Sequence, residues 1–230
     1  MRFGAEGRIL KTIFIYSVLF STMFVNACGQ SKQEKMRLAN QHKDKALQLR
    51  YEGRIEEAIR EQLQAIDLNP DDSSLLVNLT GFYLDNGKVE KAKNTAERLL
   101  AKAPNNAWGH YLYAESLLKL DEKEKSLAEY KKASDLEPAN PLFLVNLGVL
   151  YGELNNVPEQ KKAYEKALEI NPNYTDAIYN LALLEERENN NERAVVLFKR
   201  VIDLETENKE MLRRAQEKLD IFKNKKVAKP

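Results

Sequence analysis

Apolar residues recur along most of this chain with the spacing of helix faces. In the segment 144–151, LVNLGVLY, the apolar or small residues follow one another in steps of three, one and three, which places Leu144, Leu147, Gly148 and Tyr151 on one side of an α-helix. Steps of four and three follow further along and define the face of a second helix, as in Ala194, Phe198 and Val201. The pattern predicts pairs of amphipathic helices from residue 39 to residue 208.

Proline punctuates this pattern at a fixed interval. The segments LNPDD, KAPNN, LEPAN and INPNY each carry a proline 34 residues from the last, namely Pro70, Pro104, Pro138 and Pro172. A fifth segment, LETEN, keeps the interval but has Thr206 where proline is expected. Because proline cannot continue a helix and disfavours helical angles in the residue before it, each one marks the end of a helix pair.

The interval predicts five repeats of equal length and an all-α fold. Counted from the prolines, the repeats are 39–72, 73–106, 107–140, 141–174 and 175–208. One helix pair cannot bury its apolar face alone, whereas stacked pairs share a core that a terminal helix must cap. The segment 209–223 has apolar residues on one side and charges elsewhere, so we expect it to be the capping helix. The segment 224–230 is a short basic tail.

This arrangement resembles the tetratricopeptide repeat (TPR), a pair of antiparallel helices of 34 residues. The resemblance covers nearly the whole chain and implies an α-solenoid of five tandem TPR helix pairs. Three positions depart from the family's pattern: Ser126 and Gln160 replace the usual small alanine, and Thr80 stands where glycine or alanine is common.

In that family the first helix of each pair lines a concave groove that binds a partner. The resemblance assigns to this groove Asn78, Trp108, Tyr111, Leu142, Val145, Asn146, Val149, Tyr179 and Asn180, together with Leu112, Leu118 and Leu183. Aromatic and aliphatic anchors with amide groups between them suit an extended peptide or an amphipathic helix. Packing against the next repeat is an equal alternative for Leu112 and Leu183. The groove type that clamps a C-terminal carboxylate is not expected, since Leu47, Trp108 and Leu112 occupy three of its polar or basic positions.

The N-terminus differs in character from the repeats. Arg2, Arg8 and Lys11 precede an uncharged run, 12–31, whose apolar centre is IFIYSVLFSTMFV. A basic start followed by a short apolar stretch and small residues is typical of a secretory signal. The alternative is an uncleaved helix that spans a membrane once, for which the whole uncharged run is just long enough.

The only cysteine, Cys28, lies at the end of this run. The four residues Val25, Asn26, Ala27 and Cys28 resemble the lipobox of bacterial lipoproteins, in which the thiol receives a lipid and the peptide is cut before it. The resemblance implies a signal peptide over 1–27, an anchor and helix lead-in over 28–38, and a place in the bacterial cell envelope, on the periplasmic face or the cell surface. TPR lipoproteins of this kind include pilotins of type IV pilus biogenesis. The alternative is a cysteine that merely ends a signal peptide.

Composition and motifs argue against catalysis and against nucleic acid. The chain has 36 Lys and Arg against 35 Asp and Glu, whereas a nucleic-acid binder carries a strong basic excess. Its two histidines lie in different repeats, and neither a His-Glu-x-x-His metal motif nor a phosphate-binding loop occurs. We therefore expect no enzyme activity, no metal and no cofactor or small-molecule substrate. Two functions remain: a lipid-anchored scaffold or adaptor that holds a partner protein, and a single-span protein with a regulatory or sensory role in which Cys28 is unmodified.

Overall fold

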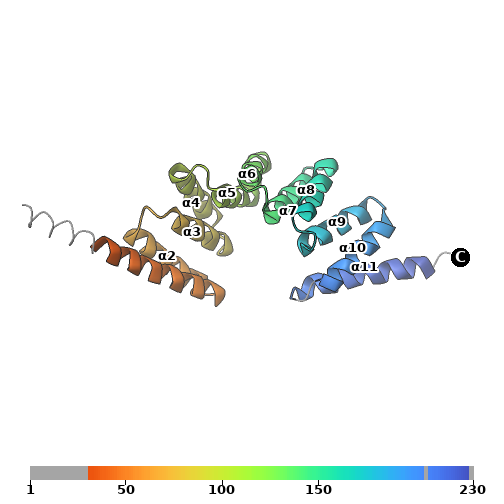
Figure 1. Cartoon of the computed structure of the whole chain (residues 1–230), viewed down its shortest axis with the longest axis horizontal. Coiled ribbons are helices and arrows are strands. Elements are labelled where there is room, and N and C mark those ends of the chain that lie inside the picture. The colour runs from red at the N-terminus through yellow and green to blue at the C-terminus, as the bar shows by residue number, and fades with distance from the viewer. Residues whose placement is uncertain (1–30, 205–206, 228–230) are drawn as a thin grey trace, which may run out of the picture. The chain divides into compact units, whose positions relative to one another are not determined.

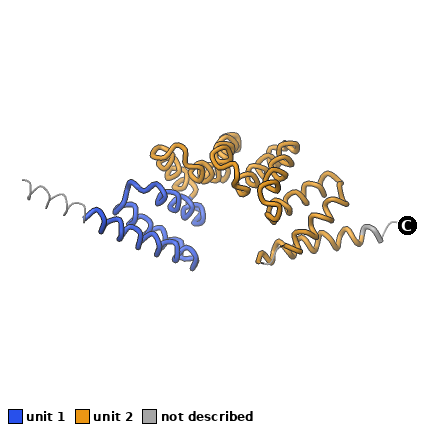
Figure 2. Tube along the Cα trace, viewed as in Figure 1, with its two compact units in different colours: residues 1–88 blue, residues 89–230 orange. Residues whose placement is uncertain are grey.

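A computed structural model describes residues 31–204 and 207–227 of the chain. Every regular element in these two ranges is a helix, which confirms the all-α class (Figure 1). The chain divides into two compact units, residues 1–88 and 89–230 (Figure 2). The boundary falls inside the second repeat. The predicted signal peptide, Cys28 and the alternative single-span helix lie outside the described residues.

The first unit contains the helical residues 31–51, α2 (Ile55–Leu68) and α3 (Ser73–Asp85). Small residues, Ala46 and Ala58, let the helices approach, and Leu79 and Phe82 of α3 fill the space beside them. Leu49 and Ile59 complete this core cluster. The residues that the sequence spacing places on one helix face are thus the residues that are buried in this unit.

The second unit contains eight helices among the described residues. They are α4 (Val89–Lys102), α5 (Ala107–Lys119), α6 (Lys123–Leu136), α7 (Pro141–Glu153), α8 (Val157–Ile170), α9 (Thr175–Arg187), α10 (Asn191–Leu204) and α11 (Lys209–Val227). Within the pairs, α5 packs on α6, α7 on α8 and α9 on α10, and α11 packs on α10. The first helices of neighbouring pairs also meet, since α7 contacts α9.

Side-chain caps fix where several first helices begin. Asp72 accepts a hydrogen bond from the backbone N–H of Ser74, and Asn140 does the same for Leu142. Such caps satisfy backbone donors that the first turn leaves without a partner. The helices α3, α5, α7 and α9 begin at the residues from which the second to fifth repeats are counted.

A left-handed residue turns the chain between the two helices of every repeat. Gly53, Gly87, Asp121, Asn155 and Asn189 have φ between 57° and 76°, and they stand 34 residues apart. Glycine adopts this conformation without strain, and Asn and Asp tolerate it better than other residues. The same backbone conformation therefore recurs in every repeat, although the residue that adopts it is Gly, Asp or Asn.

Helices α7 and α8 approach each other closely at Gly148. A Cβ atom at this position would lie 2.5 Å from Cε1 of Tyr164, whose ring is buried. One turn away, Gln160 fills the place where the family has a small residue. Its Nε2 donates to the Tyr164 hydroxyl (3.2 Å), and its Oε1 accepts from Arg187 of α9 (2.6 Å). Having Gln160 here in place of a small residue thus adds a hydrogen-bonded link between two repeats.

The terminal helix is longer than the sequence analysis predicts. The predicted end is residue 223, whereas α11 continues to Val227. Within the described ranges, no helix combines the length and apolar character needed to cross a membrane.

Candidate functional site

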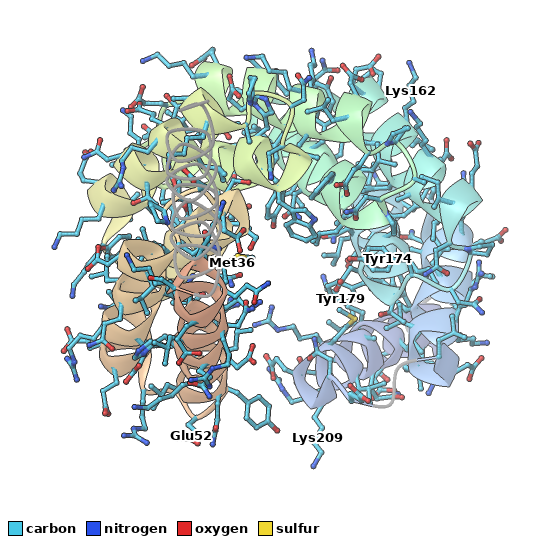
Figure 3. The ribbon with its side chains drawn as sticks, turned by 60° about the vertical axis from the view of Figure 1, so that its left-hand side comes forward. Met36, Glu52, Lys162, Tyr174, Tyr179 and Lys209 are labelled. Carbon is cyan, nitrogen blue, oxygen red and sulfur yellow. The ribbon has the colours of Figure 1, made fainter. Side chains whose placement is uncertain are left out.

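The predicted groove residues of the second unit all lie on three first helices, α5, α7 and α9. Asn78 lies on α3 in the first unit, where it is half-buried. Figure 3 shows Tyr174 and Tyr179 on the inner side of the helical layer and Lys162 of α8 on its outer side. The inner side is therefore formed by the first helices and the outer side by the second helices.

An aromatic cluster joins α5 to α7 and includes one residue of α6. It consists of Trp108, Tyr111, Tyr130 and Phe143. The Trp108 ring meets Phe143 edge-on at 5.1 Å between centroids and Tyr111 at 5.6 Å, while Tyr111 stacks on Phe143 at 5.1 Å. Phe143 and Tyr130 are buried, whereas Trp108 is 39% exposed. The cluster thus has a rigid buried base and an exposed indole at its edge.

Two asparagines repeat the same hydrogen bond on successive helices. Asn146 Nδ2 donates to the carbonyl of Leu142 (3.0 Å) and to the Tyr111 hydroxyl (3.3 Å). Asn180 Nδ2 donates to the carbonyl of Asp176 (2.8 Å). These bonds use the amide nitrogen, so the amide oxygen is the remaining acceptor of each side chain.

The remaining predicted residues differ in depth. Tyr179 is half-buried and meets Phe198 edge-on at 5.9 Å. Leu142 and Val149 are also half-buried, so each keeps some exposed surface. Val145 is only 5% exposed and belongs to the core cluster of the unit, so it offers a partner almost no surface.

Acidic residues outnumber basic ones on the three helices, where Lys119 and Arg187 stand at the C-terminal ends of α5 and α9. No lysine or arginine occurs in residues 107–118, 141–153 or 175–186, whereas Glu115, Glu153, Asp176, Glu185 and Glu186 do. Because the whole chain is nearly neutral, its basic residues are concentrated on other segments.

Carboxylates and burial keep the nearby phenols protonated. Burial raises the pKa of Tyr111, and the charges of Glu115 and Tyr174 add to this effect. Burial and Glu115 likewise raise the pKa of Tyr130, whose hydroxyl donates to Glu115 Oε1. Burial raises the pKa of Tyr174, with Asp176 contributing. These four groups and Asp176 consequently form one electrostatically connected neighbourhood.

The sequence analysis did not select Phe143, Tyr130, Tyr174, Glu115 or Asp176. Two of them carry a signal that could have found them. Glu115 stands at position 9 of its repeat and Asp176 at position 2, both of which face the groove in the family. The other three are placed by packing between helices, which the position within a repeat does not reveal.

Both histidines contact a carboxylate through Nδ1. The Nδ1 atom of His110 lies 2.6 Å from Glu129 and its Nε2 atom 2.9 Å from the carbonyl oxygen of Pro104. His42 makes the same contact with Glu61 in the first unit. No cluster of three or more metal-ligating side chains occurs among residues 31–204 and 207–227.

Comparison with known proteins agrees with this architecture. The family model "Psidin, N-terminal TPR repeats region" matches residues 82–200, slightly more than half of the chain. The mitochondrial import receptor subunit TOM70 of Homo sapiens is 27% identical over 166 residues, which cover 68% of this chain and 27% of the relative. The chain therefore spans about a quarter of the length of that relative.

Solved structures share the fold at low identity. PilF of Pseudomonas aeruginosa superimposes with a TM-score of 0.71 at 18% identity, over 85% of this chain and 89% of that one. YrrB, described as a TPR protein with an unusual peptide-binding site, superimposes with a TM-score of 0.56 at 19% identity, over 76% and 90%.

Proposed function

Because the chain belongs to the tetratricopeptide-repeat family, we propose that it is a scaffold whose second unit binds a partner protein or peptide on the inner side of α5, α7 and α9. The observation that carries this proposal is the aromatic cluster, in which Trp108 stands exposed on a base that is already packed. We further propose that a lipid on Cys28 ties the scaffold to the bacterial envelope, and that the partner belongs to an envelope assembly such as a pilus or a secretion system.

The energetics of the cluster favour binding. Residues that dominate interfaces are enriched in Trp and Tyr and lie in well-packed surroundings, and removing one costs about 2 kcal/mol or more. Trp108 is held by edge contacts with Tyr111 and Phe143, so a partner that covers it loses little side-chain entropy. The half-buried Leu142, Val149 and Tyr179 extend the apolar surface on both sides.

One experiment can identify the partner and test whether it binds the inner side of α5, α7 and α9. Cross-linking in the native cell and mass spectrometry identify the bound protein. The variant Trp108→Ala with Tyr179→Ala is then compared with wild type. We expect capture to fall at least tenfold, because about 2 kcal/mol per lost anchor corresponds to more than that factor.

The matched control is Val196→Ala on α10. Val196 is the most exposed large hydrophobic residue of the described second unit, at 64%, and lies on a second helix. Circular dichroism must show equal helical content in all variants. Undiminished capture by the folded Trp108→Ala, Tyr179→Ala variant, or an equal loss in Val196→Ala, would contradict the proposed surface.

The lipid anchor has an independent test. Growth with a palmitate analogue should label the wild-type chain and leave Cys28→Ala unlabelled, because a thiol is needed for the attachment. Firm anchoring requires two or three acyl chains, so Cys28→Ala should also move from the membrane fraction to the soluble fraction. If Cys28→Ala stays in the membrane and neither chain is labelled, the single-span alternative is correct.

A further inference from the structure

The helix of residues 31–51 differs in charge from the sequence that follows it. It carries six Lys and Arg residues against two Asp and Glu, whereas residues 52–230 carry 27 against 32. The helix is thus basic, and the sequence after it is slightly acidic. An anionic surface would attract this helix and weakly repel the rest of the body.

Basic and large apolar residues share one stripe of this helix. Lys32, Met36, Lys43, Leu47 and Tyr51 follow one another in steps of four or seven, so they lie within about 100° around the helix axis. Met36 and Leu47 are 43% and 40% exposed, and Tyr51 is 95% exposed. Three exposed apolar side chains on one stripe differ from the singly scattered ones that any surface carries.

The stripe lies away from the packing between helices. Helix 31–51 packs on α2 through another side, where Ala46 and Leu49 join Ala58 in a core cluster. The repeat pattern does not account for Tyr51, because the residues at intervals of 34 after it are all charged, namely Asp85, Lys119, Glu153 and Arg187. The apolar residue at this position is therefore particular to the first repeat.

Three lysines of the helix make no ion pair within residues 31–204 and 207–227. Lys32 and Lys35 are exposed, and Lys43 donates only to Asn40 Oδ1 (3.2 Å). The other basic residues each pair with a carboxylate at 2.6 Å: Arg37 with Glu34, Lys45 with Glu61, and Arg50 with Asp85. Three positive charges thus remain for anions from outside the protein.

The position of the helix in the chain indicates which anionic surface lies nearby. Its first residue, Ser31, stands three residues after Cys28, the predicted site of the lipid. Three extended residues span roughly 10 Å. A lipid on Cys28 would therefore hold the beginning of the helix at the level of the phospholipid headgroups.

We propose that helix 31–51 lies on a membrane that contains anionic phospholipids, with its stripe of basic and apolar residues facing the headgroups. Met36, Leu47 and Tyr51 enter the boundary between headgroups and acyl chains, and the lysines extend to the phosphates. The proposed lipid anchor brings the helix to the surface, and this inference rests on it only in that respect. The slightly acidic repeats then point away from the membrane.

The magnitude follows from charge and from tethering. Each Lys or Arg close to an anionic bilayer strengthens binding by about fivefold. A tether turns this contact into an intramolecular step, so even a weak attraction is enough to hold the helix down. Neutralising three lysines should accordingly lower the ratio of bound to unbound helix at least tenfold.

The test uses the full chain with Cys28→Ala, so that an added lipid does not contribute. An environment-sensitive dye is attached through Asn40→Cys on the stripe or, as a control, through Gln64→Cys on α2, where the side chain is exposed. Vesicles consist of phosphatidylcholine alone or mixed with phosphatidylglycerol. The apolar segment 13–25 tethers the chain to both kinds alike, so a difference between them reports the effect of surface charge.

The dye at residue 40 should shift its emission to shorter wavelength on the anionic vesicles and not on the neutral ones. The dye at residue 64 should not shift on either. Raising the salt from about 0.1 M to about 1 M shortens the screening length from roughly 10 Å to 3 Å and should reverse the shift.

A triple variant locates the contact. Lys32→Gln, Lys35→Gln and Lys43→Gln together should remove most of the shift, while circular dichroism shows unchanged helical content. The matched control neutralises three exposed lysines on second helices of the second unit: Lys162→Gln, Lys166→Gln and Lys199→Gln. The control changes the net charge equally and should behave as the parent chain does.

The outcomes separate this inference from the proposed anchor. If Cys28 takes up the palmitate analogue but the dye at residue 40 shows no shift, or shifts equally on neutral vesicles, the inference is wrong and the anchor stands. If Cys28 is unlabelled and the shift occurs, the anchor is wrong and the contact stands. An equal loss in the matched control, or a triple variant that keeps the shift and instead loses capture of the partner protein, would overturn the inference.

Discussion

The close approach of α7 and α8 makes opposite predictions for two glycines. Gly148→Ala would place a Cβ atom 2.5 Å and 2.8 Å from two ring atoms of Tyr164. Carbon atoms in contact are normally about 3.5 to 4.0 Å apart, so the ring or the helix must move by roughly 1 Å. Tyr164 is 1% exposed and has little room to move. In α3, by contrast, a Cβ atom at Gly81 would meet nothing within 4 Å.

The magnitudes follow from two terms of opposite sign. Alanine is favoured over glycine in a helix by about 1 kcal/mol, and this gain applies at both positions. Overpacking a rigid core costs typically 1 to 3 kcal/mol, and the short contacts at Gly148 place it near the upper end. We therefore expect Gly148→Ala to lower the free energy of unfolding by about 2 kcal/mol. Gly81→Ala should raise it by about 0.5 to 1 kcal/mol.

Amide hydrogen exchange measured by mass spectrometry suits this comparison, because it reports opening of each unit separately. Exchange should become faster in α7 and α8 of Gly148→Ala and slower in α3 of Gly81→Ala. Tyr164→Leu removes the ring, so the cost of Gly148→Ala should be smaller in that background. The reasoning is refuted if Gly148→Ala is as protected as wild type, or if its cost is unchanged when the ring is absent.

Three further predictions concern a turn, a buried charge and the phenols. Asp121 has a φ of 62°, which glycine adopts without strain and valine does not. In urea unfolding, Asp121→Gly should therefore raise the free energy of unfolding by about 0.5 kcal/mol, and Asp121→Val should lower it by about 1 to 2 kcal/mol. Equal urea midpoints for the two variants would contradict this. Glu185→Leu removes a fully buried carboxylate that Lys161 contacts. Chemical unfolding should show a free energy of unfolding lower by about 1 to 3 kcal/mol. The loss should not be larger, because the lysine can turn towards water. Burial raises the pKa of Tyr113 from its usual 10.0 to about 12, with Glu97 contributing. Burial also raises the pKa of Tyr130 and Tyr164. The stabilisation from these protonated phenols is complete below pH 10.0 and is lost as the pH rises through their folded pKa values. Ultraviolet titration should therefore show late tyrosinate formation accompanied by unfolding, and tyrosinate formation at the pH usual for free tyrosine would refute this.

The helix pairs were predictable because their signals are local. The prolines, the steps of three and four, and the small residues at crossing points are all read within one repeat, and the first helices begin at Ser73, Ala107, Pro141 and Thr175 as counted. The all-α fold and the family are accordingly confirmed. The membrane anchor stays a prediction, since Cys28 lies outside the described residues.

The candidate site was less predictable because it depends on contacts between repeats. The position of Val145 in its repeat indicates the inner side, but its depth depends on residues of the next repeat that cover it. The stacking of Tyr111 on Phe143 likewise joins two repeats.

The exposed edge of the aromatic cluster has a practical consequence. Trp108 is the only tryptophan among 230 residues. Its emission spectrum therefore belongs to one point on the inner side of the second unit and to nothing else in the molecule. Covering the indole would shift this emission to shorter wavelength, so the unlabelled protein carries its own optical reporter of occupancy. A ligand that left the spectrum unchanged would have to bind elsewhere.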